Sequence, residues 1–166
     1  MKKSVDKICD WIESLIYSLF IVICIMLFGV KSFSVDGKSM VPTLEPGQRV
    51  IAVDFFYKAK NNDIVIIDSN NKYGKPLIKR IIAVSGQTIE INDFGDIIVD
   101  GIVIDSGSEN VRGDMEYPLT VPEGYVFVMG DNRTVSLDSR DSRIGLIDDR
   151  CIAGKYVFVM GFGKNE

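Results

Sequence analysis

The chain has 166 residues and a formal net charge of −4, which is enough length for one domain with a core of its own. The acidic balance and the lack of a basic block argue against a nucleic-acid-binding protein. Histidine is absent and the three cysteines have no C-x-x-C spacing, which argues against a zinc site. Cys24 lies inside the most apolar run and Cys9 just before it, which argues against a disulfide framework.

The first feature along the chain is an apolar run, "SLIYSLFIVICIMLFGV", which extends uncharged from Ser14 to Val30. A helix over residues 11–30 would span roughly 30 Å, the thickness of a bilayer's hydrocarbon core. The run has no polar stripe of the kind that a helix on a soluble domain shows. It is longer than the apolar part of a cleavable signal peptide, and no small-x-small site follows it. We therefore predict a transmembrane anchor over residues 11–31.

Lysines and an arginine flank this run on both sides, so the positive-inside rule leaves its orientation open. The basic residues before it are Lys2, Lys3 and Lys7, and those after it are Lys31, Lys38 and Arg49.

After residue 31 the pattern changes to short runs rich in Val and Ile, separated by Gly, Asn and Asp, which is typical of β-strands. The predicted strands are 49–53, 63–68, 76–84, 88–91, 96–99, 102–104, 125–129 and 155–160. The pair Asp100-Gly101 predicts a tight hairpin. We expect a mainly β domain over residues 32–166, built as a sandwich or partly open barrel. Residues 97–122 are expected to form a variable loop or small subdomain.

The segment "VDGKSMVPTL" contains an isolated serine, Ser39, just before a proline turn. A serine nucleophile needs a base, and the absence of histidine excludes a Ser-His-Asp triad. Lysine is a suitable base only where burial lowers its pKa from about 10.4. Lys79 meets this condition in the pattern, because Leu77, Lys79 and Ile81 alternate onto one face of an apolar strand. From the pattern alone, a solvated Lys79 and an ordinary turn serine remain open.

Three segments taken together are more specific: "GKSMVPTL" (37–44), "IKRIIAVSG" (78–86) and "MGDNRTVSLDSR" (129–140). In order and spacing they resemble the signature segments of bacterial type I signal peptidases. With the N-terminal apolar run and "NDIVIID" (62–68), the resemblance covers most of the chain. Only about residues 97–122 contribute little to it.

The resemblance implies a signal-peptidase-like β-barrel or sandwich in which Ser39 is the nucleophile and Lys79 the general base. It implies that Ser136 hydrogen-bonds and orients the Lys79 amine. The backbone N–H of Ser39 would stabilise the oxyanion, while Gly37 stands where some relatives supply a serine hydroxyl. The remaining supporting residues would hold the site in place: Asp138 paired with Arg140, and Asp131 and Arg133 fixing the same loop.

The resemblance also implies a substrate, the signal peptide of a secreted preprotein, cut after a small-x-small sequence while bound as an added β-strand. The pocket positions are apolar, as small side chains require: Phe33, Val35, Met40, Leu44, Leu77 and Ile78. No metal, cofactor or nucleic acid is implied. Residues 1–10 would lie in the cytoplasm, and the catalytic domain would lie outside the cytoplasmic membrane, on the lipid bilayer.

The sequence departs from this family at Val135, where Asn is usual, and after the Lys-Arg pair at Ala83, Ser85 and Gln87. A second Asp-Ser-Arg also follows the first. Two other functions stay open. One is a catalytically silent, membrane-anchored β-domain that binds peptides. The other is a self-cleaving Ser/Lys peptidase of the SOS-repressor type, although such proteins carry a DNA-binding region where this chain has its apolar run.

Overall fold

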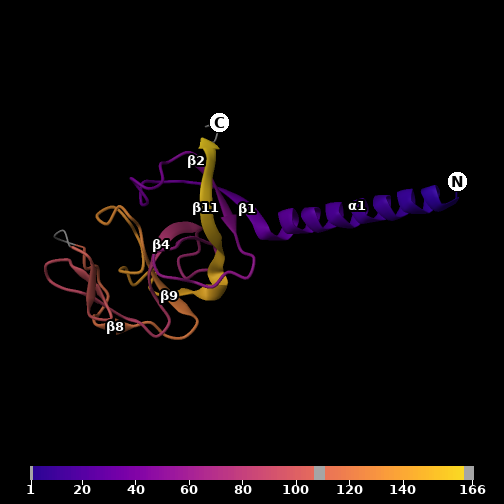
Figure 1. The fold of residues 1–166 in the computed structure, drawn as a ribbon. Coiled ribbons are helices and arrows are strands. Elements are labelled where there is room, and N and C mark those ends of the chain that lie inside the picture. Colours follow the sequence, from indigo (N-terminus) through magenta and orange to yellow (C-terminus); the bar gives the residue numbers. More distant parts are fainter. Residues whose placement is uncertain (1, 107–110, 163–166) are drawn as a thin grey trace.

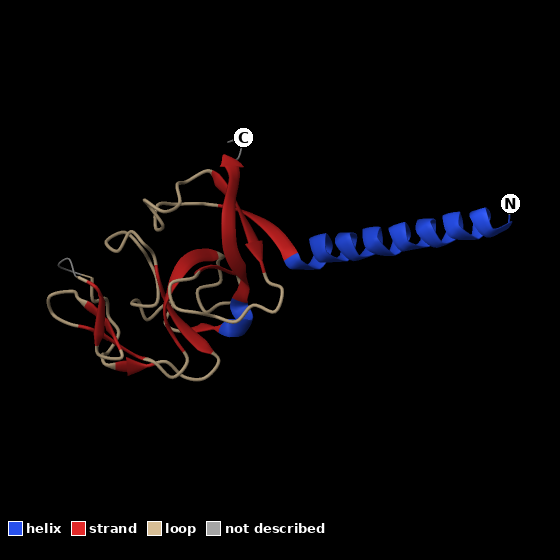
Figure 2. Cartoon of the chain, in the orientation of Figure 1, coloured by secondary structure: helices blue, strands red, loops and turns tan. Residues whose placement is uncertain are grey.

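The computed structural model describes residues 2–106 and 111–162, and leaves out the side chains of residues 2–6, 9, 25–28 and 162. A long helix, α1 (Lys2–Gly29), projects away from the strands that make up most of the remaining chain (Figure 1). Apart from α1, the one helical segment in the described ranges is the short 3-10 turn Asp149–Cys151 (Figure 2). The protein is therefore mainly β, as the sequence predicts.

A curled, antiparallel sheet carries the candidate site. Its strand order is β1-β2-β11-β3-β4-β9-β10. The bounds are β1 (Val30–Ser34), β2 (Gln48–Val53), β3 (Ile64–Ile67), β4 (Leu77–Val84), β9 (Tyr125–Met129), β10 (Ile147–Asp148) and β11 (Ile152–Phe162). Strand β11 pairs with both β2 and β3 and contains several register shifts, which bend a strand and increase its twist. Within the described residues the two end strands, β1 and β10, do not pair with each other, so the sheet does not close into a barrel.

A smaller sheet has the order β7-β6-β5-β8, with β5 (Thr88–Ile91), β6 (Ile97–Val99), β7 (Ile102–Asp105) and β8 (Leu119–Thr120). The predicted hairpin is present: Val99 pairs with Ile102, and Asp100 and Gly101 both have positive φ, as a tight two-residue turn requires. Buried side chains of β5 and β6 pack with Phe127 and Met129 of β9, which joins the two sheets in one core. Part of the predicted variable region, residues 107–110, lies outside the described residues.

Every predicted strand range overlaps an observed strand, whereas β1, β8 and β10 are not predicted. The predicted anchor extended to Lys31, but the helix ends at Gly29. Val30 and Lys31 instead begin β1, because they pair with Val53 and Ala52 of β2.

The apolar run predicted to span a membrane does form a helix. Within the described part of the chain, which omits the side chains of residues 25–28, no helix is long and apolar enough to cross a membrane. The structure thus shows the helix and does not show the predicted transmembrane span.

Candidate active site

The turn that carries Ser39 follows β1 and is fastened to the large sheet by its own apolar residues. Met40 and Leu44 are almost fully buried in one core cluster with Val50, and the Leu44 N–H donates to the Met40 carbonyl at 2.9 Å. Gly37 has φ of +88°, a conformation that favours glycine. The buried side chains of Met40 and Leu44 and the bend at Gly37 therefore hold Ser39 at the surface of the core.

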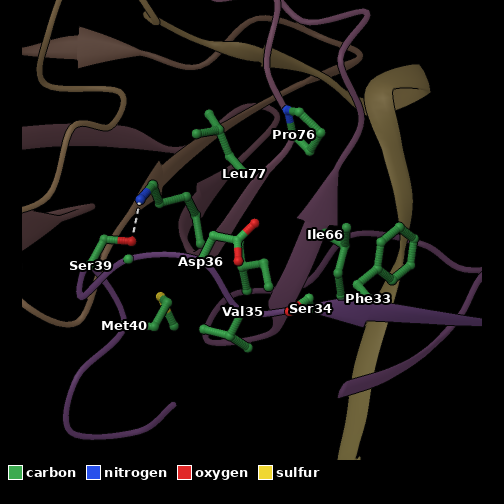
Figure 3. A pocket seen from close by; sticks show the side chains of 12 residues that line it. Phe33, Ser34, Val35, Asp36, Ser39, Met40, Ile66, Pro76 and Leu77 are labelled. Atoms are coloured by element: carbon green, nitrogen blue, oxygen red, sulfur yellow. Dashed lines mark hydrogen bonds between the residues drawn. The ribbon is translucent and has the colours of Figure 1, made fainter. Parts of the chain in front are cut away.

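Lys79 lies in the middle of β4, opposite Val65 of β3, and is only 3% exposed. Its Nζ lies 2.7 Å from the Oγ of Ser39 and donates a hydrogen bond to it (Figure 3). The two residues are 40 positions apart in the sequence and meet because β4 runs beside the turn that carries Ser39. A serine hydroxyl in contact with a buried amine is the geometry that a nucleophile and its base require.

Burial lowers the pKa of Lys79 from its ordinary value of 10.5 to about 8. The Asp138 carboxylate acts in the opposite direction, and the Arg140 guanidinium adds to the lowering. Desolvation is the largest cause, since the surrounding side chains disfavour the charged ammonium. Close to pH 8 a large fraction of the Lys79 amines is consequently neutral and able to accept a proton.

A buried ion pair, Asp138 with Arg140, supports the loop beside this dyad. Arg140 Nε lies 2.7 Å from Asp138 Oδ1, and its Nη2 lies 2.8 Å from Oδ2. The second carboxylate oxygen also accepts the Gly130 N–H at 3.0 Å. Arg140 further donates to the carbonyls of Val111 and Arg133, at 2.9 and 2.7 Å. The pair therefore ties three segments together beneath the site.

Asp131 and Arg133 belong to the same loop and connect it to two different elements. Asp131 accepts two hydrogen bonds from Arg80 of β4, at 2.7 and 2.6 Å, and one from the Thr43 hydroxyl at 2.5 Å. Arg133 pairs with Asp105 at the end of β7, at 3.0 Å. Asp131 and Arg133 thus connect their loop to β4, to Thr43 and to the small sheet.

Ser136 was predicted to hydrogen-bond the Lys79 amine, and the structure lacks that bond. The Ser136 hydroxyl is buried and has no hydrogen-bond partner within the described residues. It does lie at the site: a Cβ added to Gly130 would overlap both the Ser136 hydroxyl and the Ser39 carbonyl oxygen. Only a glycine lets the loop approach the nucleophile turn this closely.

A cavity of about 160 Å³ opens beside the dyad (Figure 3). Five of the six predicted pocket residues line it: Phe33, Val35, Met40, Leu77 and Ile78. Gly37, Ser39 and Lys79 line it as well. The sixth predicted residue, Leu44, does not line it, because it is fully buried in the core beneath the turn.

Four lining residues were not predicted: Ser34, Asp36, Ile66 and Pro76. Ile66 comes from the neighbouring strand β3, a pairing that periodicity alone does not give. Ser34 and Asp36 alternate with the predicted Phe33 and Val35, so the extended segment around them was the available signal.

Comparison with known proteins places these residues in a family. Residues 8–161 match the family model described as signal peptidase, peptidase S26. Signal peptidase I from Bacillus licheniformis is 35% identical over 183 aligned positions, covering 99% of this chain and 96% of that protein. Signal peptidase I T from Bacillus subtilis (strain 168) is 32% identical over 180 positions, covering 99% and 91%. A crystal structure of a signal peptidase I from Enterococcus faecalis, 30% identical, aligns over 61% of this chain and 98% of that chain with a TM-score of 0.49. The chain therefore belongs to the signal peptidase family, peptidase S26, and is a serine peptidase of the signal peptidase I type.

Proposed function

We propose that this serine peptidase removes N-terminal signal peptides from secreted preproteins, with Ser39 as the nucleophile and Lys79 as the general base. The observation that carries these roles is the 2.7 Å contact between Lys79 Nζ and Ser39 Oγ. It is supported by the burial of Lys79, which brings its pKa to about 8. An ordinary surface lysine would be almost fully protonated at neutral pH and could not accept the hydroxyl proton.

The proposed reaction proceeds by two acyl transfers. Neutral Lys79 takes the proton of the Ser39 hydroxyl as Oγ attacks the carbonyl carbon of the scissile peptide bond. The backbone N–H of Ser39 donates to the resulting oxyanion. The Lys79 ammonium then gives its proton to the leaving amine, which frees the mature chain and leaves an ester on Ser39. A water, deprotonated by Lys79, attacks the ester. Lys79 then returns this proton to the departing Ser39 Oγ, and the released signal peptide ends in a carboxylate.

The cavity beside the dyad supports a preference for small side chains before the cleaved bond. Its volume of about 160 Å³ limits the size of the substrate side chains that it can hold, and most of the residues that line it are apolar. Strand β1, which carries Phe33, is an end strand of the large sheet, and among the described residues no strand pairs with its outer edge. A substrate strand can align on the backbone groups of this edge. We infer that a small-x-small sequence is selected in this way.

Cleavage of a preprotein with an Ala-x-Ala site tests this function directly. The wild-type chain in detergent is expected to cut once, after the second alanine, as read from the N-terminal sequence of the product. Ser39→Ala removes the nucleophile and is expected to abolish cleavage. Ser142→Ala changes an exposed serine away from the cavity and is expected to retain cleavage. Cleavage by Ser39→Ala would contradict the proposal, and so would a wild-type chain that does not cleave.

We also propose that α1 anchors the chain in the cytoplasmic membrane, with the N-terminus inside and the β-domain outside. The support is the uncharged run Ser14–Val30, together with the exposure of large apolar side chains along α1, among them Leu15, Ile16 and Phe20. Such a surface is unfavourable in water and is expected to be covered. The proposed substrates would bring their own apolar segments to the same bilayer.

Extraction of bacterial membranes with alkaline carbonate tests the anchor. The wild-type chain is expected to stay in the membrane pellet, and protease added to spheroplasts should digest its β-domain. The double substitution Phe20→Lys and Ile21→Lys should move the chain to the supernatant, because each charge costs about 2.5–3.5 kcal/mol at the centre of a membrane helix. The matched change at exposed Phe55 and Phe56 should leave it in the pellet. Release of the wild type by carbonate would refute the anchor.

A further inference from the structure

The cavity beside Ser39 has an acidic residue on its wall for which the reaction above has no use. Asp36 lies directly before Gly37 and three residues before Ser39, and it lines the cavity together with the apolar residues. Figure 3 shows the carboxylate directed into the space between Leu77 and Ile66. Asp36 and Lys79 are the charged residues of this wall.

The carboxylate of Asp36 also has no ion-pair or hydrogen-bond partner among the described residues. Within residues 2–106 and 111–162, none of the ion pairs or side-chain hydrogen bonds involves Asp36, although Lys38 is close in sequence. Most carboxylates of the adjoining loops have partners; Asp131 has Arg80 and Asp138 has Arg140. Asp36 is exposed, but it also borders a cavity with mostly apolar walls. On that side its carboxylate attracts a cationic or hydrogen-bond-donating group more strongly than a carboxylate surrounded by water does.

The state of Lys79 strengthens this attraction during the reaction. In the mechanism proposed above, Lys79 is neutral when the substrate is bound and Ser39 is about to attack. The negative charge of Asp36 is then the one formal charge on the described cavity wall. A basic side chain in the cavity would meet an opposite charge there and no competing ammonium.

We propose that Asp36 is a specificity-determining residue, which lets the cavity accept a short basic side chain at one position of the small-x-small site. This proposal rests on the proposed function, because it concerns the substrate of the same site. A purely apolar cavity of this size would accept small neutral side chains and exclude a charged one, since the ammonium would lose its water without gaining a partner. With Asp36 present, the ammonium gains an ion pair at the cavity wall.

The test uses peptides with norvaline or ornithine, which share a carbon chain and differ by an ammonium group, at each position of the small-x-small site in turn. The ratio of kcat/KM for the ornithine peptide to that for the norvaline peptide is measured within each enzyme, the full chain in detergent. Asp36→Asn is expected to lower this ratio about 3- to 10-fold at one position. Added salt should lower the ratio of the wild type and leave that of Asp36→Asn unchanged.

Glu45→Gln is the matched control, because it removes one exposed negative charge from the same turn, away from the cavity. It should keep the wild-type ratio. An equal ratio in wild type and Asp36→Asn at every position, or an equal fall in Glu45→Gln, would overturn the role of Asp36. An Ala-x-Ala peptide without ornithine separates this failure from a failure of the proposed function: if the wild type does not cut it, both proposals fall.

Discussion

Lys79→Met is expected to lower kcat/KM for an Ala-x-Ala substrate by about 10³-fold or more, because Lys79 is the one basic side chain among the described residues that contacts the Ser39 hydroxyl. For the wild type, kcat/KM should rise with pH and level off above about pH 8, where Lys79 has lost its proton. The direction follows from the base role: below this pKa the amine is protonated, and activity falls about tenfold for each pH unit. Initial rates at low substrate concentration across the pH range measure both effects.

The same substitution separates loss of chemistry from loss of the fold. The pKa of Lys79 is lower in the folded protein, about 8, than its ordinary value of 10.5, so holding its proton costs stability. The cost is full below pH 8 and disappears as the pH rises to 10.5; it amounts to roughly 3 kcal/mol. Lys79→Met should therefore be inactive at neutral pH and at least as stable as the wild type. Lys58→Met, at an exposed lysine, should keep both activity and pH profile. Substantial cleavage by Lys79→Met would mean that another base acts.

The strands that sequence reasoning located are those whose own residues carry the signal. Strand β4 alternates in its apolar pattern, and the hairpin at Asp100 is encoded by a two-residue turn. Strand β1 begins at Val30, the last residue of the apolar run, and its other residues, Lys-Ser-Phe-Ser, include one apolar side chain, too few to give a strand pattern. Strands β8 and β10 have two residues each and exist only through pairing with β5 and β9. Such pairing is a property of the tertiary structure, which a local pattern does not contain.

At the site, the chemistry of Ser39 and Lys79 could be argued from residue type, while the contacts around them could not. The ion pairs of Arg80 with Asp131 and of Arg133 with Asp105 join residues 51 and 28 positions apart. The positions of Leu44 and Asp36 could likewise not be predicted from residue type. Both are close in sequence to Ser39, but the fold turns the apolar one into the core and the acidic one toward the cavity. The resemblance to the family placed Leu44 in the pocket and did not include Asp36.

Asp138→Asn is expected to destabilise the folded chain by about 3–5 kcal/mol, because it leaves the Arg140 guanidinium buried without its counter-charge. Asp138 is 1% exposed and Arg140 5% exposed. The chain supplies a matched control, since Asp-Ser-Arg is repeated at 141–143 with Asp141 and Arg143 paired in the same way. Arg143 is largely exposed, so Asp141→Asn should change stability little. Denaturant unfolding of the full chain in detergent compares the free energies of unfolding of Asp138→Asn and Asp141→Asn. Equal losses of stability would show that the contribution of the Asp138–Arg140 pair does not depend on its burial.

Asp138→Asn should also move the pH profile of the reaction, which a purely structural loss would not do. The Asp138 carboxylate raises the pKa of Lys79, opposing the lowering by burial. Removing its charge leaves burial and Arg140 to act together, so the pKa of Lys79 falls further and the acidic limb of kcat/KM moves to lower pH. Under conditions where the variant remains folded, residual activity should therefore persist further into the acid range than in the wild type, while Asp141→Asn keeps the wild-type profile. A limb that stays in place, or moves to higher pH, would show that Asp138 does not act on the charge of Lys79.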